Sequence, residues 1–145
     1  MCSVGLARAL ALGSWTRPFT AATTGLSLLN SGITVHQVRV AASGMVGVHG
    51  NHADGVVIDG LVSEGNNTER FNSSPVSGGL KITRSRGVTI RNSIFRGNAG
   101  QGMWLDESVY DMTIVGNEMR GSAGHGAVLE ISAKALFADN VVEGN

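Results

Sequence analysis

The chain has little of several residue types, and each scarcity excludes a class of protein. Its 145 residues include one cysteine, Cys2, so neither an internal disulfide nor a cluster of thiolate metal ligands can form. The 11 basic and 11 acidic residues cancel, and a pI near 6.9 gives no general electrostatic attraction for nucleic acid. No apolar run approaches the roughly 18 residues of a membrane span. We therefore expect no nucleic-acid partner and no membrane-spanning segment.

Glycine, in contrast, is abundant. The chain has 21 glycines against two prolines, which is about twice the average glycine share. Glycine accepts the positive φ angles of tight corners. Because 42% of the residues are hydrophobic, the chain is expected to fold around a core, with many tight turns.

A strand-like sequence motif recurs along the chain. Residues 87–98 read GVTIRNSIFRGN, and residues 111–122 read DMTIVGNEMRGS. Equivalent starts fall at Gly32, Gly55, Gly87, Asp111 and Lys134. Their spacings are 23, 32, 24 and 23 residues, so one interval is longer by an insertion, which we place at 66–78. Self-similarity at a fixed period indicates a repeat architecture.

Each repeat contains short strands separated by corners. Apolar residues occupy the second and fourth places after each start: Ile33 and Val35, Val56 and Ile58, Val88 and Ile90, Met112 and Ile114, Ala135 and Phe137. A second column contains Val40, Ser63, Phe95, Met119 and Val142, and a further strand follows Gly47, Gly79, Gly102 and Gly126. No stretch is left for a crossover helix, so the strands are expected to pair in parallel between stacked coils.

This pattern resembles the repeat of the right-handed parallel β-helix proteins, the pectate-lyase-like superfamily, over residues 25–145. The resemblance implies an all-β fold: a right-handed parallel β-helix, or solenoid, of about five coils of 23–24 residues. That superfamily includes polysaccharide lyases, polygalacturonases, alginate epimerases, phage tailspikes and adhesins, so the fold leaves function open. It favours an extracellular or cell-surface location, although the chain shows no convincing signal peptide.

The two ends of the sequence depart from the repeat. Residues 1–24 repeat poorly, and they are interpreted as a short helical cap or an artificial start. At the other end, the chain stops at Asn145 without a cap. Because an uncovered β-helix end is a template for aggregation, we expect the sequence to be a fragment of a longer β-helix.

Candidate ligand-binding residues lie on the strand that follows the glycine column. Stacking places equivalent positions about 4.8 Å apart. One outward column is Ser27, His49, Lys81, Trp104 and Val128, and the next is Asn51, Thr83, Asp106 and Glu130. Arg84 stands one residue further along, at the corner. An exposed Trp104 would contact a sugar face, Lys81, His49 and Arg84 would bind uronate carboxylates, and Asn51 would add hydrogen bonds. The alternative is a solvated surface, with Lys81 and Arg84 as counter-charges.

Four residues are candidates for catalysis. Asp106 and Glu130 on adjacent coils are a potential acid and nucleophile, or ligands for a divalent cation such as calcium as a cofactor. Lys81 is a potential base. His125, in Gly124-His125-Gly126, resembles the Gly-His-Gly of polygalacturonases. The carboxylates that those enzymes carry on the two preceding coils are absent here, as are the motifs of alginate epimerases and pectate lyases. Whether the chain is an enzyme is therefore left open.

Two functions of different class follow. The first is a carbohydrate-interacting module, part of a polysaccharide lyase, epimerase or hydrolase, whose partner is a polysaccharide and potentially an acidic one. The second is a non-catalytic structural or adhesive β-helix, such as a stalk or tailspike segment. The insertion at 66–78 either forms a wall of the binding groove or is a tolerated surface loop. The sequence does not determine the oligomeric state.

Overall fold

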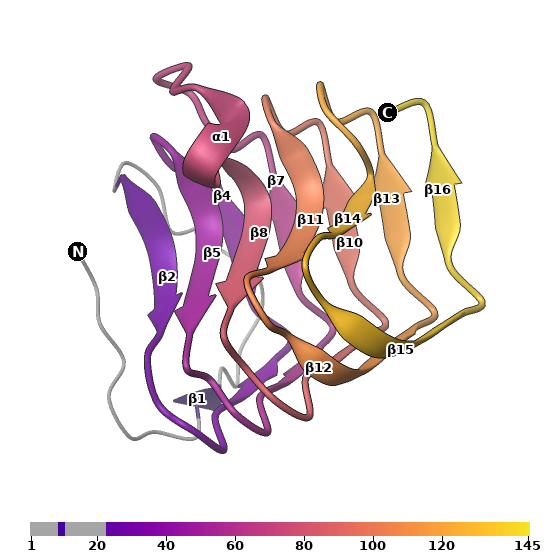
Figure 1. Ribbon diagram of the computed structural model, residues 1–145. Helices are drawn as coiled ribbons and strands as arrows, with labels where there is room; N and C mark the ends of the chain where they lie inside the picture. Colours follow the sequence, from indigo (N-terminus) through magenta and orange to yellow (C-terminus); the bar gives the residue numbers. More distant parts are fainter. Residues whose placement is uncertain (1–8, 11–22) are drawn as a thin grey trace.

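The computed structural model describes residues 9–10 and 23–145 as three parallel β-sheets whose strands alternate around each coil (Figure 1). The first sheet contains β1 (Ala9–Leu10), β3 (Thr34–His36), β6 (Val57–Asp59), β9 (Thr89–Arg91), β12 (Tyr110–Val115) and β15 (Ala133–Ala138). The second contains β4 (Arg39–Ala41), β7 (Val62–Glu64), β10 (Ile94–Arg96), β13 (Glu118–Arg120) and β16 (Val141–Glu143). The third contains β2 (Thr24–Leu28), β5 (Val46–Asn51), β8 (Gly78–Thr83), β11 (Gln101–Asp106) and β14 (Ala127–Leu129). The predicted all-β solenoid is confirmed.

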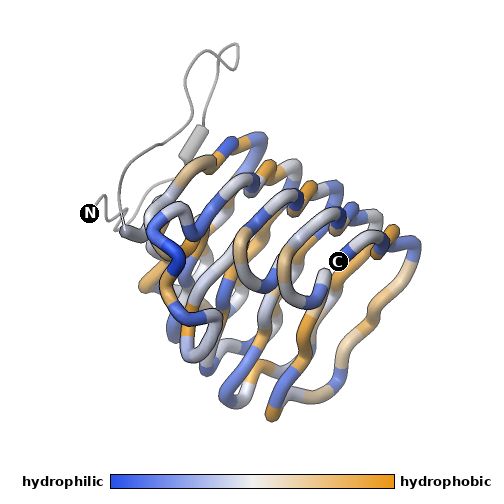
Figure 2. Tube along the Cα trace, turned by 90° about the horizontal axis from the view of Figure 1, so that it is seen from above, coloured by the Kyte–Doolittle hydropathy of each residue, from blue (hydrophilic) through white to orange (hydrophobic). Residues whose placement is uncertain are grey.

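The predicted columns are also confirmed by the strand register. In the first sheet the paired positions run Val35, Ile58, Ile90, Ile114 and Phe137. In the second sheet they run Val40, Ser63, Phe95, Met119 and Val142. Ile58, Ile90 and Phe95 are completely buried. The hydrophobic and hydrophilic segments that alternate along each coil in Figure 2 follow from this arrangement, because alternate side chains of a strand point to the core.

Buried asparagines close the corners between the second and third sheets. The Asn66 amide Nδ2 donates to Asn98 Oδ1 at 2.9 Å, and the Asn98 Nδ2 donates to the Ser63 carbonyl at 3.2 Å. Gly65 and Gly97, the residues before them, have φ of 59°, a region that glycine enters without a Cβ clash. These asparagines therefore satisfy buried polar groups of neighbouring coils at the corners.

The glycines that recur on the third sheet are needed for a different reason from the corner glycines. A Cβ on Gly79 would collide with the Gly102 carbonyl oxygen, and one on Gly102 with the Gly126 carbonyl oxygen. These glycines therefore permit close approach of successive coils, and not an unusual turn.

The insertion leaves the stack between the second and third sheets. It includes α1 (Ser73–Val76), a single turn in which the Asn72 side chain accepts from the Ser74 amide at 3.2 Å. In Figure 1 this turn lies over the upper ends of β5 and β8, so the insertion reaches the face that carries the candidate residues.

The N-terminal segment is described only in part. The cap expected in residues 1–24 lies outside the described residues except for Ala9–Leu10, which are extended and pair with β3, and Thr23–Thr24. Within the described ranges no helix has the length and hydrophobicity that a bilayer span needs.

Candidate functional site

The third sheet brings the candidate columns into register as predicted. Strand pairing aligns Ser27, His49, Lys81, Trp104 and Val128, and beside them Asn51, Thr83 and Asp106. Glu130, the fourth member of the second predicted column, follows directly after the end of β14 at Leu129. Parallel strands place equivalent residues of successive coils next to each other. Lys81 therefore lies between His49 and Trp104 on one face.

The expectation that this face is exposed is wrong at its centre. Trp104 is 7% exposed, Lys81 is 4% and Asp106 is 6%. The Lys81 ammonium covers the indole, with Nζ 3.3 Å from the ring centroid, and it donates to the carbonyl of Pro75 in the insertion at 2.7 Å. These side chains point away from the core, but the insertion and their own contacts cover them.

Lys81 and Asp106 form an ion pair across neighbouring coils. Lys81 Nζ lies 2.8 Å from Asp106 Oδ2, and the other carboxylate oxygen accepts from the Glu107 amide at 2.7 Å. At the edge of the sheet, Arg84 forms a second ion pair with Glu107. Two of the three side chains that were expected to bind uronate carboxylates, Lys81 and Arg84, are therefore neutralised by carboxylates of the protein. For Lys81 this is the counter-charge role that the alternative of a solvated surface gave it.

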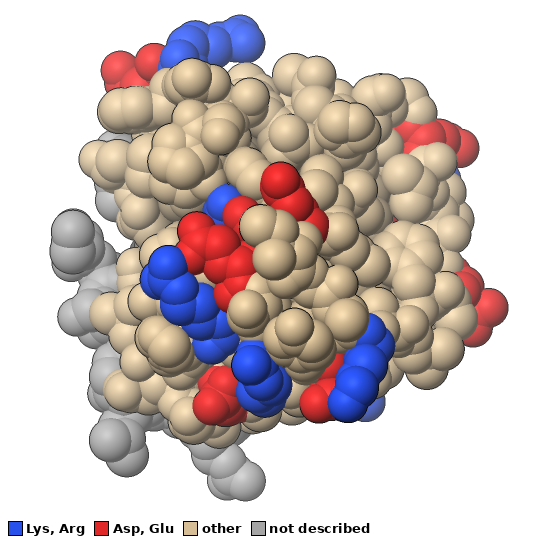
Figure 3. Space-filling view, in the orientation of Figure 1, with Lys and Arg blue, Asp and Glu red and all other residues tan. Residues whose placement is uncertain are grey.

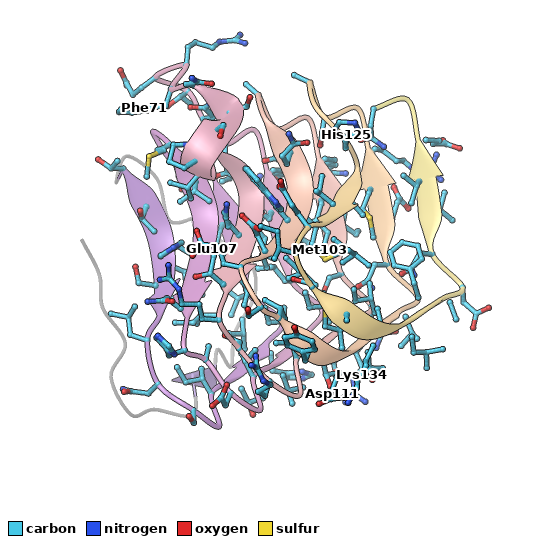
Figure 4. The ribbon with its side chains drawn as sticks, in the orientation of Figure 1. Phe71, Met103, Glu107, Asp111, His125 and Lys134 are labelled. Carbon is cyan, nitrogen blue, oxygen red and sulfur yellow. The ribbon has the colours of Figure 1, made fainter. Side chains whose placement is uncertain are left out.

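An open cleft of about 400 Å³ lies over β11 and β14, beside the insertion. Its lining residues are Ser74, Pro75, Lys81, Gln101, Trp104, Asp106, Glu107, His125, Val128, Glu130 and Ile131. Figure 4 shows His125 before β14 and Glu107 beyond the end of β11, so the two residues lie toward opposite ends of the cleft. In the space-filling view, acidic groups gather at the middle of this face, and most of the basic side chains lie below them (Figure 3).

The cleft unites five candidates and leaves three outside it. Lys81, Trp104, Asp106, His125 and Glu130 line it. His49, Asn51 and Arg84 line a neighbouring hollow of about 190 Å³, which shares Pro75, Lys81 and Glu107 with the cleft. The predicted groove is thus divided where Lys81 meets Pro75.

His49 is electrostatically coupled to Lys81, which lies at the boundary between the cleft and the hollow. Burial lowers the pKa of its imidazole below the ordinary value of 6.5, and the nearby positive charge of Lys81 lowers it further. The fold therefore favours the neutral imidazole.

Gln101 is a lining residue that the sequence reasoning missed. Its side-chain Oε1 accepts from the backbone amide of His125 at 2.6 Å. The signal was present, because Gln101 stands 24 residues before His125, at the equivalent place in the preceding coil. Gln101 holds the corner that presents His125 to the cleft.

The acidic residues do not assemble a metal centre in the described part of the chain. No three His, Cys, Asp or Glu side chains gather there closely enough to hold an ion. Of the two predicted cation ligands, Asp106 is bound to Lys81, and Glu130 is exposed at the cleft. A third protein ligand for this pair is lacking among the described residues.

Comparison with known proteins agrees with the architecture. A family model described as a right handed beta helix region matches residues 19–145, which is most of the chain. No curated protein and no solved structure matches it.

Proposed function

The chain belongs to the right-handed β-helix family, and from the cleft on its third sheet we propose that it binds a polysaccharide. The observation that carries the proposal is the composition of the cleft wall. Trp104, Val128 and Ile131 supply apolar surface, while Gln101 and Glu130 supply hydrogen-bonding groups. Ligand sites combine mostly apolar walls with a few polar groups, and sugars present both C–H faces and hydroxyls.

The size and openness of the site support a polymer. A cleft of about 400 Å³ is within the range of roughly 300–1,000 Å³ that ligand sites occupy. The adjoining hollow around His49 and Asn51 continues the same face beyond Pro75. A polysaccharide that runs across the coils would contact both the cleft and the hollow.

The Trp104 indole N–H supports the proposal independently. This nitrogen is buried and has no hydrogen-bond acceptor among the residues that the structure describes. Leaving a buried donor unsatisfied costs on the order of 1–3 kcal/mol. A sugar hydroxyl is one group that would satisfy it once the contact of Lys81 with the Pro75 carbonyl opens, with the Lys81–Asp106 ion pair kept intact.

The proposal is limited to binding. Lys81 and Asp106, two of the four catalytic candidates, neutralise each other in a buried pair, so neither is a free base or acid. A polysaccharide partner implies an extracellular or cell-surface location, and we propose that location with it.

The experiment is electrophoresis in gels that contain neutral or acidic polysaccharides. We expect at least one polysaccharide to retard the chain, and Glu130→Gln and His125→Ala to reduce the retardation, because both side chains are exposed at the cleft. Asp139→Asn is the matched control, since Asp139 is exposed and lies outside the cleft. Equal retardation of all four proteins would contradict the proposed site.

A structural or adhesive role is the second candidate. It is favoured by ion pairs that link successive coils, such as Arg39 and Arg96 on either side of Glu64. Such pairs stiffen the stack without a ligand. A folded protein that no polysaccharide retards would support this role and contradict the first.

A further inference from the structure

The charge balance of the cleft limits which glycans it accepts, an inference that rests on the proposed function. Among its lining residues, Asp106, Glu107 and Glu130 carry carboxylates, and Lys81 carries the one permanent cation. The whole chain has a formal net charge of zero, so no general field of the protein compensates this local excess. Selectivity by charge must come from the cleft itself.

The positive groups on this face are already engaged. The Lys81 ammonium contacts the Asp106 carboxylate, the Pro75 carbonyl and the Trp104 ring. Arg84 at the neighbouring hollow pairs with Glu107. A uronate carboxylate would have to displace a protein carboxylate from one of these cations, and for Lys81 that exchange would leave the buried Asp106 unpaired, which is strongly unfavourable.

Glu130 is the uncompensated charge. It is exposed at the cleft, and no cation of the described residues lies within ion-pair distance of it. Its carboxylate would accept hydrogen bonds from sugar hydroxyls, and such charge-assisted bonds are about twice as strong as neutral ones. The same carboxylate would repel an anionic sugar.

We propose that the cleft binds glycans without anionic groups and discriminates against uronates and sulfated sugars. This replaces the expectation that Lys81, His49 and Arg84 recognise uronate carboxylates. Glu130 is the residue that determines the selectivity against anionic glycans. Lys81 is a positioning residue, because its ammonium is bound to Asp106 and to Pro75 in the insertion.

The test uses pairs of oligosaccharides that share a backbone and differ in charge: fully methyl-esterified and free oligogalacturonate, cello-oligosaccharide and its C6-oxidised form, and manno-oligosaccharide and oligomannuronate. Titration at low salt and pH 7 is followed by the fluorescence of Trp104 in a Trp15→Phe variant, because the chain has two tryptophans. We expect at least one uncharged member to bind, and its anionic counterpart to bind at least about tenfold more weakly.

Substitutions test whether the difference in affinity between uncharged and anionic oligosaccharides arises from particular charges of the protein. Glu130→Gln should strengthen binding of the anionic member by about threefold, and Glu107→Gln, which frees Arg84, should do so as well. Asp139→Asn should leave the ratio unchanged. If the Trp15→Phe protein with no further change bound the anionic member as tightly as the uncharged one, or more tightly, the inference would be overturned while the proposed function stayed in place. Binding of none of the six oligosaccharides would overturn the proposed function itself.

Discussion

The ammonium nitrogen of Lys81 on β8 lies 2.8 Å from the Asp106 carboxylate on β11, and both residues are more than nine-tenths buried. The same nitrogen donates to Pro75 in the insertion. One ion pair therefore joins two coils and holds the insertion against the third sheet. Because a buried pair is costly to separate, this contact is central to both the stability and the shape of the cleft.

The costs of removing the two partners of the pair should not be additive. Asp106→Asn leaves the Lys81 ammonium buried without a counter-charge, and we expect a loss of about 3–5 kcal/mol in the free energy of unfolding. The double variant Lys81→Met, Asp106→Asn should cost at least about 1 kcal/mol less than the sum of the single changes. Urea denaturation of the three variants measures this coupling, and additive costs would contradict it.

His49 should titrate below its ordinary pKa of 6.5, because burial and the Lys81 charge disfavour the imidazolium. A group with a lowered folded pKa stabilises the fold above its unfolded pKa, and this contribution is lost as the pH falls through the folded pKa. NMR titration of the His49 ring protons measures the value directly. Lys81→Met should raise it, and an unchanged value in that variant would exclude the coupling.

Glu64 should stabilise the protein near neutral pH. Partial burial alone would raise the pKa of its carboxyl, but hydrogen bonds from Arg96 and Arg39 and their charges outweigh burial and lower it. Glu64→Gln should therefore cost about 1 kcal/mol at pH 7. The difference should shrink as the pH falls below the ordinary glutamate value of 4.5.

The matched control for the Glu64→Gln substitution is Glu69→Gln, because the Glu69 side chain is exposed on the insertion. The Glu69→Gln change should alter the free energy of unfolding little, both at pH 7 and below pH 4.5. A pH-independent cost of Glu64→Gln would show that the two arginines do not stabilise its charged form.

The glycine column should be intolerant of a single methyl group. Gly102→Ala places a Cβ against the Gly126 carbonyl oxygen, and forcing the coils apart should cost about 2–3 kcal/mol. Gly121 is a contrast, because its φ is 62° and a Cβ there would meet nothing within 4 Å. Gly121→Ala should cost about 1 kcal/mol from backbone strain alone, and thermal unfolding of the two variants compares them. Equal costs would contradict the close-approach explanation.

The fold was predictable because a parallel stack repeats its constraints in every coil. Val35, Ile58 and Ile90 occupy one column both in the sequence pattern and in the strand register. The positive φ of Gly65 and Gly97 agrees with the expectation that the abundant glycines occupy tight corners. A period of 23–24 residues therefore determines which side chains are neighbours.

Exposure within the site was not predictable in the same way. The period indicates that Lys81 and Trp104 point away from the core, but the part of the 66–78 insertion that contains α1 has no equivalent in other coils. Its position over Lys81 and Trp104 therefore follows from no repeat. The Lys81–Asp106 pair also depends on side-chain conformations that strand register leaves free. Gln101 could have been found from its spacing to His125.

The most direct test of the central claim, that the cleft is a polysaccharide site, is to map the site of binding by NMR on ¹⁵N-labelled protein with the Trp15→Phe substitution. A polysaccharide fragment that retards the protein in gels would be titrated while the Trp104 indole N–H and the amides of Gln101, His125 and Glu130 are observed. We predict that these signals shift together, with the indole N–H moving toward the position of a hydrogen-bonded donor. Shifts confined to other faces of the solenoid, with the Trp104 indole unchanged, would contradict the account.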